Sequence, residues 1–379
     1  MKKIIVLFLL TGGTFILHSF TRVIIQKHYK DKELRKLYSG PASGWPKPNI
    51  DADLVDFKDI GALPQNPFKN TDTNLVKLGK TLFFEPKMSG SGQISCASCH
   101  VPTLNWTDGR VTAMGHDHQE GGRNTPTIMN TWFNKHLFWD GRSNSLEDQA
   151  FGPINSEIEM HGNFGTIASR LSPLKGYREM FKAAFGNENI TADRITGALA
   201  AFQRTVQSRR SRFDEFVSGK SEILTDSEIR GLHVFRTQAR CINCHNGALF
   251  TDNQFHNIGL TYYQRKYEDL GRYNATHDPN DVGKFKTPSL RDIMVTRPWM
   301  HNGLFDDLVG IINLYNSGMH MNDPLTDAQK ADSMHPKTSP HLQPLNLTPE
   351  QKKDLAAFIA SLSSPVMRVP KPNLPGRAN

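Results

Sequence analysis

The chain has 379 residues, a length that allows about two domains, each with its own hydrophobic core. Hydrophobic residues make up 37% of the sequence and charged residues 22%, a balance typical of a folded globular protein. The net charge is +8, but Lys and Arg are scattered and no nucleic-acid motif occurs, which argues against a nucleic-acid-binding protein. The mild positive charge instead suits a small protein partner or an anionic surface.

The first 25 residues have the pattern of an export segment. Two lysines precede an apolar run over residues 4–17, which at 14 residues is shorter than the roughly 20 that cross a bilayer. This length favours a secretion signal, although no small-residue cleavage site is evident and residues 23–26 could extend the run. We therefore predict a signal peptide or N-terminal anchor over residues 1–25, followed by a linker or N-terminal extension over residues 26–70.

A short helix predicted over residues 75–84 leads into "SCASCH" at 95–100, where two cysteines stand three apart and a histidine follows. The arrangement recurs in "RCINCH" at 240–245, and the two stretches contain all four cysteines of the chain. Disulfides, one zinc ion held by both pairs, or two dithiol redox motifs would each account for the cysteines. None of them explains the histidine that directly follows both pairs.

Covalent haem explains the cysteines and the histidines together. Two thiols add to the two vinyl groups of the porphyrin, and the next residue is placed to ligate the iron. We therefore predict two c-type haems. The first is bound by Cys96, Cys99 and His100, and the second by Cys241, Cys244 and His245.

Three more helices are predicted after the first motif. A helix over residues 191–206 has one apolar face and a capping threonine at its start. The helix that leads into the second motif opens with Thr225 and Glu228, the spacing of a capping box. A helix near the end has Thr348 as its cap and Pro349 in its first turn.

No convincing run of alternating strands occurs, and Gly- and Pro-rich stretches predict long loops. The fold class is therefore mostly α, with two cytochrome c-like haem domains. The two cysteine motifs lie 145 positions apart, and we place the seam between the domains near 205–225. We expect one haem domain over 71–208, completed by residues 345–379, and the other over 209–344.

Several motifs, in the same order, resemble the bacterial dihaem cytochrome c peroxidase family, including its MauG-type methylamine-utilisation branch. They are "LGKTLFFEPKMSGSGQISCASCH", "MGHDHQEGGRNTPT", "FWDGR", "GPINSEIEM", "TRPWMHNGLFDDLVGIINLYNSG" and "LTPEQKKDLAAFIASL". The resemblance implies a periplasmic enzyme with a peroxidatic haem in the first domain and an electron-transfer haem in the second.

The resemblance also implies three catalytic residues. Trp139 matches the tryptophan that bridges the two haems as a polarisable path for electrons. Glu159 matches the distal carboxylate that moves a proton between the peroxide oxygens, since O–O cleavage requires first a base and then an acid. Gln149 is implied as a hydrogen-bonding residue in the same pocket.

Further residues are implied as metal ligands. His116 matches a loop histidine that caps the peroxidatic iron in a resting state and then moves away, which suits a Gly-rich surface loop. An exposed histidine, or an adventitious metal site shared with His118, is the alternative. A calcium ion between the domains is also implied, held by Asn124 and by the main-chain carbonyls of Thr296 and Pro298.

One position departs from the peroxidase branch. In that branch a methionine ligand of the second iron stands 14 residues after the histidine of the "HDG" or "HNG" motif, and the same count from His301 reaches Tyr315. This resembles the MauG-type branch, in which a tyrosine ligates that haem. Met319 and Met321 are the alternative ligands.

We therefore expect a dihaem c-type peroxidase that reduces hydrogen peroxide to water with electrons from an external donor, such as a small c-type cytochrome or cupredoxin. One alternative is a MauG-like enzyme that oxidises a protein substrate, and another is a dihaem electron carrier without catalysis. A carrier has no use for Glu159 and Gln149 above an accessible iron. The oligomeric state is open, with a homodimer among the options.

Overall fold

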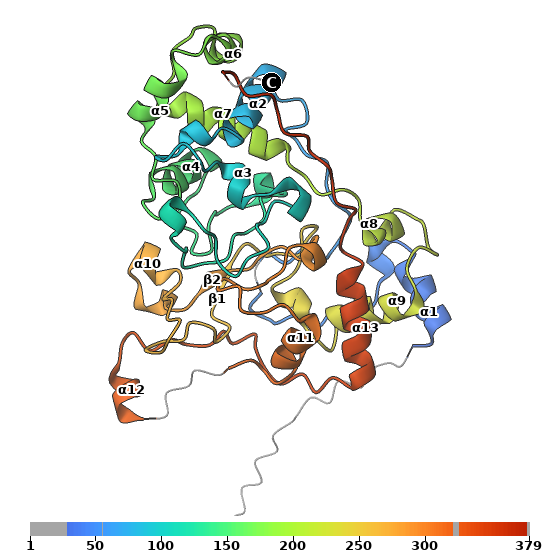
Figure 1. Cartoon of the computed structure of the whole chain (residues 1–379). Helices are drawn as coiled ribbons and strands as arrows, with labels where there is room; N and C mark the ends of the chain where they lie inside the picture. The colour runs from blue at the N-terminus through green and yellow to red at the C-terminus, as the bar shows by residue number, and fades with distance from the viewer. Residues whose placement is uncertain (1–28, 55, 321–325, 377–379) are drawn as a thin grey trace, which may run out of the picture.

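The computed structural model describes residues 29–54, 56–320 and 326–376 (Figure 1). The signal peptide or anchor expected over residues 1–25 lies outside these ranges, as does Met321. Within the described ranges, no helix has both the length and the apolar character needed to cross a bilayer.

The prediction of a mostly helical protein is confirmed. The α-helices are α1 (Asp31–Tyr38), α2 (Thr73–Phe83), α3 (Cys96–Cys99), α4 (Leu146–Asn155), α5 (Phe164–Leu171), α6 (Lys175–Phe185), α7 (Ala192–Thr205), α8 (Arg212–Val217), α9 (Asp226–Arg236), α10 (Tyr273–Thr276), α11 (Leu308–Asn316), α12 (Asp327–Ala331) and α13 (Pro349–Ala360). Among the described residues, β1 (Phe255–His256) and β2 (Phe285–Lys286) form the one sheet, an antiparallel pair. Figure 1 shows α2 to α7 in the upper part of the molecule and α1, α8, α9, α11 and α13 in the lower part.

The upper helices are organised by the crossing of α2 and α7. Thr191 caps α7 by accepting a hydrogen bond from the Arg194 N–H, as the sequence predicted, and the apolar face of α7 packs against α2 and α4. The helices approach so closely that a Cβ added at Gly79 would lie 1.8 Å from the carbonyl oxygen of Ala198. The core around this crossing includes Leu78, Leu82, Phe83, Trp106, Phe181, Leu199 and Phe202.

The lower helices are organised by the crossing of α9 and α13. Thr225 and Glu228 form the predicted capping box of α9, and a second capping box begins α13. A Cβ added at Gly231 would lie 1.9 Å from the carbonyl oxygen of Asp354. This second core includes Phe213, Leu232, Phe235, Phe250, Leu355, Phe358 and Ile359.

The C-terminal segment is arranged differently from our expectation that residues 345–379 complete the first domain. Helix α13 packs on α9 in the second core, and only the tail beyond it reaches the first core, through Val369 and Leu374. Figure 1 shows this tail running from α13 up to α2. An apolar helix face fits either of two similar helical cores, so its pattern did not indicate which core α13 would join.

Within the extension over residues 26–70, the described residues up to Ile60 are held against the second core, whereas the Asn66 side chain donates to the Arg204 carbonyl oxygen on α7. Helix α1 packs against α9, and Tyr38 and Trp45 are buried there. The hydroxyl of Tyr38 lies 2.9 Å from Nδ1 of His233, and the Arg236 guanidinium donates to the carbonyl oxygen of Pro46 at 2.6 Å. This segment is therefore a structural part of the second half rather than a free linker.

Candidate active site

The first cysteine pair lies on α3, a single helical turn that directly precedes His100. The Ser95 N–H donates to the Ser98 hydroxyl at 3.0 Å, which closes the turn. Nδ1 of His100 lies 3.0 Å from the carbonyl oxygen of Trp106. Because a carbonyl oxygen only accepts, Nδ1 carries the proton and the lone pair of Nε2 is available to an iron ion.

The second pair repeats this geometry around a 3₁₀ turn, Cys241–Asn243. Nδ1 of His245 lies 3.0 Å from the carbonyl oxygen of Phe250. Burial lowers the pKa of both motif histidines, although their backbone hydrogen bonds oppose the shift. Both imidazoles are therefore neutral, which is the form that binds a metal ion.

The arrangement of the four thiols fits haem attachment better than the alternatives. All four thiols are free, and Cys96 packs in the first core whereas Cys241 packs in the second. Among the described residues, no group of potential metal ligands combines the two pairs, so a single zinc site shared by both is excluded. A c-type haem requires two thiols for attachment and a nearby imidazole whose Nε2 is free to bind iron. Each half provides both, because a backbone hydrogen bond fixes the Nδ1 side of the imidazole.

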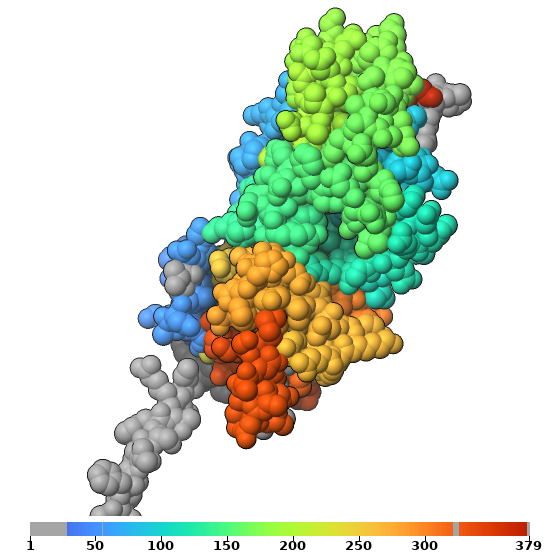
Figure 2. All heavy atoms as spheres, turned by 90° about the vertical axis from the view of Figure 1, so that its left-hand side faces the viewer, coloured from blue at the N-terminus to red at the C-terminus, as the bar shows by residue number. Residues whose placement is uncertain are grey.

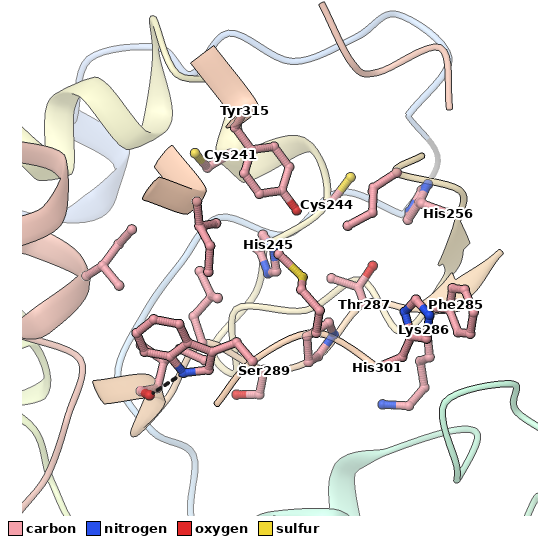
Figure 3. A pocket seen from close by; sticks show the side chains of 18 of the residues that line it. Cys241, Cys244, His245, His256, Phe285, Lys286, Thr287, Ser289, His301 and Tyr315 are labelled. Carbon is pink, nitrogen blue, oxygen red and sulfur yellow. Dashed lines mark hydrogen bonds between the residues drawn. The ribbon is translucent and has the colours of Figure 1, made fainter. Parts of the chain in front are cut away.

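A cavity of about 280 Å³ lies beside the second motif (Figure 3). Its wall is largely apolar, as the face of a porphyrin requires, and includes Phe235, Leu249, Ile258, Ile312 and Leu355. His245 also lines this space. The second half thus presents an imidazole to a cavity that is suited to a flat apolar group.

Tyr315, the predicted second ligand of this haem, lines the same cavity. In Figure 3 its ring lies between Cys241 and Cys244, with the hydroxyl directed into the cavity. Burial, and then the nearby thiols, raise the pKa of Tyr315 above its ordinary value. Met319 is buried outside the cavity wall, and Met321 lies outside the described residues. Of these candidates Tyr315 lines the cavity, and its role as a ligand stays a prediction.

Polar side chains gather near the first motif. Glu159 follows α4 and is half-buried; burial raises its pKa, and the charge of Arg142 partly offsets the shift. Burial, then the charges of Asp108 and Glu159, raise the pKa of the Cys99 thiol to about 11, so the Glu159 carboxyl group lies within electrostatic range of this attachment residue. Gln149 lies on α4, ten residues before Glu159, and is half-buried.

The loop that contains His116 packs directly on the Glu159 segment. The His116 N–H donates to the Glu159 carbonyl oxygen at 2.8 Å, and a Cβ added at Gly115 would lie 2.0 Å from the carbonyl oxygen of Ile158. Nδ1 of His116 is buried without a hydrogen-bond partner, and the ring centroids of His116 and His161 lie 4.6 Å apart. Sequence reasoning missed His161, although it stands only two residues after Glu159.

Trp139 lies at the contact between the two halves. Its Nε1–H donates to the carbonyl oxygen of Asn124 at 2.9 Å, and its own carbonyl oxygen accepts from the Lys286 N–H at 2.8 Å. The indole lines the second cavity, with its centroid 6.5 Å from that of the His301 ring. The tryptophan therefore connects a loop of the first half to the wall of the second cavity.

Asn124, Thr296 and Pro298 line the same cavity region. The side-chain nitrogen of Asn124 donates to the carbonyl oxygens of Arg110 and Val111 at 2.8 and 3.3 Å. The amide oxygen is therefore the atom of this side chain that is available to a cation, and the main-chain carbonyls of Thr296 and Pro298 would be the further donors of the predicted calcium site. An all-oxygen donor set of this kind fits calcium.

The sequence matches the family of di-haem cytochrome c peroxidases over residues 73–222. It is 38% identical over 326 residues to the methylamine utilization protein MauG of Methylophilus methylotrophus, covering 84% of this chain and 91% of that protein. It is 34% identical to the cytochrome-c peroxidase IdrP1 of Pseudomonas sp. (strain SCT), covering 79% of this chain and 84% of that protein.

Solved structures are similar as well. A MauG-like protein associated with microbial copper homeostasis has a TM-score of 0.69 and 31% sequence identity, covering 83% of this chain and 96% of that chain. The diheme peroxidase BthA from Burkholderia thailandensis E264 shares the fold, with a TM-score of 0.65 and 22% identity, covering 88% of this chain and 99% of that chain. The chain therefore belongs to the di-haem cytochrome c peroxidase family, and this membership implies two c-type haems.

Proposed function

We propose that this protein reduces hydrogen peroxide to water with electrons from an external donor. One peroxide molecule takes up two protons and two electrons to give two water molecules. When bound to Cys96 and Cys99, the haem supplies an iron ion that coordinates peroxide and passes electrons to it. Relatives named as cytochrome-c peroxidases support this reaction class.

The observation that carries the proposal is the placement of Glu159 near the first attachment site. Its half-buried carboxyl group has a raised pKa, so it can accept a proton from one peroxide oxygen and deliver it to the other. Gln149, on the preceding helix α4, is the proposed hydrogen-bond donor to the bound oxygen. Among the described residues that line the second cavity there is no carboxyl group, so a residue like Glu159 is found near the first motif only.

The other polar groups have proposed supporting roles. His116 caps the first iron in the resting state, because its loop lies on the Glu159 segment and its ring is partly buried. Trp139 passes electrons between the two haems from its position between the halves. A calcium ion held by Asn124 and by the carbonyls of Thr296 and Pro298 would stabilise the same contact.

A MauG-like oxidation of a protein substrate is the second candidate, and the position of Tyr315 favours it. An anionic phenolate ligand stabilises Fe(III) relative to Fe(II), whereas a thioether ligand has the opposite effect. A second haem with tyrosine ligation is therefore hard to reduce and suited to storing oxidising equivalents. The similarity to proteins named MauG agrees with this possibility.

We also propose export to the periplasm through residues 1–25, with a small c-type cytochrome or cupredoxin as the donor. The apolar run after two lysines supports export.

Stopped-flow mixing of the oxidised and the half-reduced holoprotein with hydrogen peroxide tests the proposal. We expect a direct reaction at the haem of Cys96 and Cys99, and consumption of two reduced cytochrome molecules for each peroxide. An electron carrier without catalysis would leave peroxide unchanged in both states. A MauG-like enzyme would react while fully oxidised and would then oxidise a protein rather than the cytochrome.

A further inference from the structure

Two basic side chains face the second cavity without an acidic partner. Lys286, on β2, and His301 both line the cavity (Figure 3). The ring of His301 stacks on Phe285 with centroids 3.6 Å apart, and its Nε2 is buried without a hydrogen-bond partner. Lys286 is half-buried, and no hydrogen bond or ion pair of its amine occurs among the described residues.

The other basic side chains of the cavity wall are already paired, apart from His245, the predicted iron ligand. These pairs are Arg240 with Asp51, Arg291 with Asp214 at 2.9 Å, His256 with Asp252 at 2.8 Å, and His341 with Asp51 at 2.7 Å. Within the described residues, Lys286 and His301 are therefore the basic groups of this wall that are left for an anionic ligand.

Burial of these two groups is unfavourable while no anion is bound. Burial lowers the pKa of Lys286 to about 8, and the charge of Asp252 only partly offsets the shift. Burial likewise lowers the pKa of His301 to about 4. A half-buried amine and a buried imidazole nitrogen without hydrogen-bond partners both carry a desolvation cost, which a carboxylate between them would offset.

The covalent chemistry of the haem supplies such a carboxylate at this end of the cavity. In the porphyrin the two vinyl groups lie on neighbouring pyrrole rings, and the two propionates lie on the other two rings, at the opposite edge. Figure 3 shows Cys241 and Cys244 at one end of the cavity and Lys286 and His301 at the other. Thioether bonds to the cysteines therefore direct the propionates toward the lysine and the histidine.

We propose that Lys286 and His301 bind one propionate of the haem attached to Cys241 and Cys244. The Lys286 amine forms an ion pair with the carboxylate, and Nε2–H of His301 donates a hydrogen bond to it. Both are positioning residues, and the assignment rests on haem attachment at this motif. The anchored edge of the second haem then lies beside Trp139, whose carbonyl oxygen accepts from the Lys286 N–H at 2.8 Å.

The test is the midpoint potential of this haem in the full-length holoprotein carrying Lys286→Met. Loss of the cation leaves the propionate charge uncompensated, which stabilises Fe(III). At a fixed potential we expect the reduced-to-oxidised ratio to fall about tenfold, equivalent to about 59 mV for one electron. Lys286→Arg should restore the wild-type value. Lys284→Met is the matched control, because Lys284 instead pairs with Asp281 at 3.1 Å.

His301→Leu provides a second, independent variant. It should shift the potential in the same direction, and the double variant should shift it by less than the sum, because both residues act through one propionate. Haem staining on a denaturing gel first establishes that the haem is attached. If it is attached and Lys286→Met behaves like Lys284→Met, the propionate proposal is wrong and the proposed peroxidase function is untouched. Absence of haem from Cys241 and Cys244 in the wild type would instead overturn both.

A crystal structure of the wild-type holoprotein gives a measurement that does not depend on any variant folding. We expect a propionate oxygen within hydrogen-bond distance of the Lys286 amine and of Nε2 of His301. Two propionates that both lie away from these groups would refute the proposal.

Discussion

The two halves of the molecule hold their cysteine–histidine motifs in the same way. Each half rests on a helix crossing in which a glycine lies against a carbonyl oxygen, Gly79 against Ala198 and Gly231 against Asp354. In each half the motif histidine is 3.0 Å from a backbone carbonyl oxygen through Nδ1. Neither the cores nor the motifs therefore distinguish the roles of the two haems.

The halves differ in the segments that face the motifs. Near the first motif lies the half-buried carboxyl group of Glu159, and the His116 loop packs on the Glu159 segment. The second motif faces a largely apolar cavity into which Tyr315 projects. The two motifs thus face different side chains, and such side chains determine what can bind to an iron ion and which charge is stabilised there. Figure 2 shows the two halves stacked one above the other along the long axis of the molecule.

The largest expected effect is the loss of one haem without the other. Replacing both cysteines of the first motif by serine should remove the haem of that half, because no thioether can form. The second half, with its separate core, should keep its haem. Haem staining and the haem-to-protein ratio measure this, and the corresponding double variant of Cys241 and Cys244 is the reciprocal control. Full haem retention in both variants would contradict c-type attachment.

Glu159→Gln should affect the first half alone. We expect the rate of peroxide cleavage to fall by about 10²–10⁴-fold, the usual contribution of a general acid–base group, with both haem spectra nearly unchanged. Stopped-flow spectroscopy measures the rate. Glu157→Gln is the matched control, because Glu157 is an exposed carboxylate two residues away. A wild-type rate in Glu159→Gln would show that another group, such as a water molecule, acts as the base.

The helix crossings should be equally sensitive to an added methyl group. Gly79→Ala and Gly231→Ala would each place a Cβ within 2 Å of a carbonyl oxygen, so we expect each to lower the free energy of unfolding by about 1–3 kcal/mol. Gly197→Ala on α7 is the control, because its Cβ would meet open space and should be neutral or stabilising. Denaturant titration measures all three. A large loss in only one of the two crossings would show that the halves are not equivalent.

Tyr315→Met should give the second haem a methionine ligand, as in the peroxidase branch of the family. A thioether in place of a phenolate favours Fe(II), so the reduced-to-oxidised ratio of this haem at a fixed potential should rise at least about tenfold, or about 59 mV. A methionine-type near-infrared band should appear with it. Met319→Leu is the control and should change neither property. If the wild type already has that band, or if Tyr315→Phe leaves spectrum and potential unchanged, tyrosine ligation is wrong.

Features that depend on a few neighbouring residues could be predicted from the sequence alone. The capping boxes at Thr225 and Thr348 and the Thr191 cap formed as expected, because a cap requires only side chains within one helical turn. The spacing of cysteines and histidine in each motif likewise predicted haem attachment. The count from His301 singled out Tyr315, which lines the second cavity, and its role as an iron ligand stays a prediction.

The tertiary structure decided which distant segments meet. It placed α13 in the second core, His161 beside His116, and Lys286 with His301 at the end of the cavity remote from the cysteines. The amphipathic pattern of a helix predicts that one face is buried but does not identify the helix it packs against. A single lysine or histidine has no sequence spacing that would indicate which group it binds. These contacts depend on how separate segments share one buried volume, and that is determined only when the whole chain has packed.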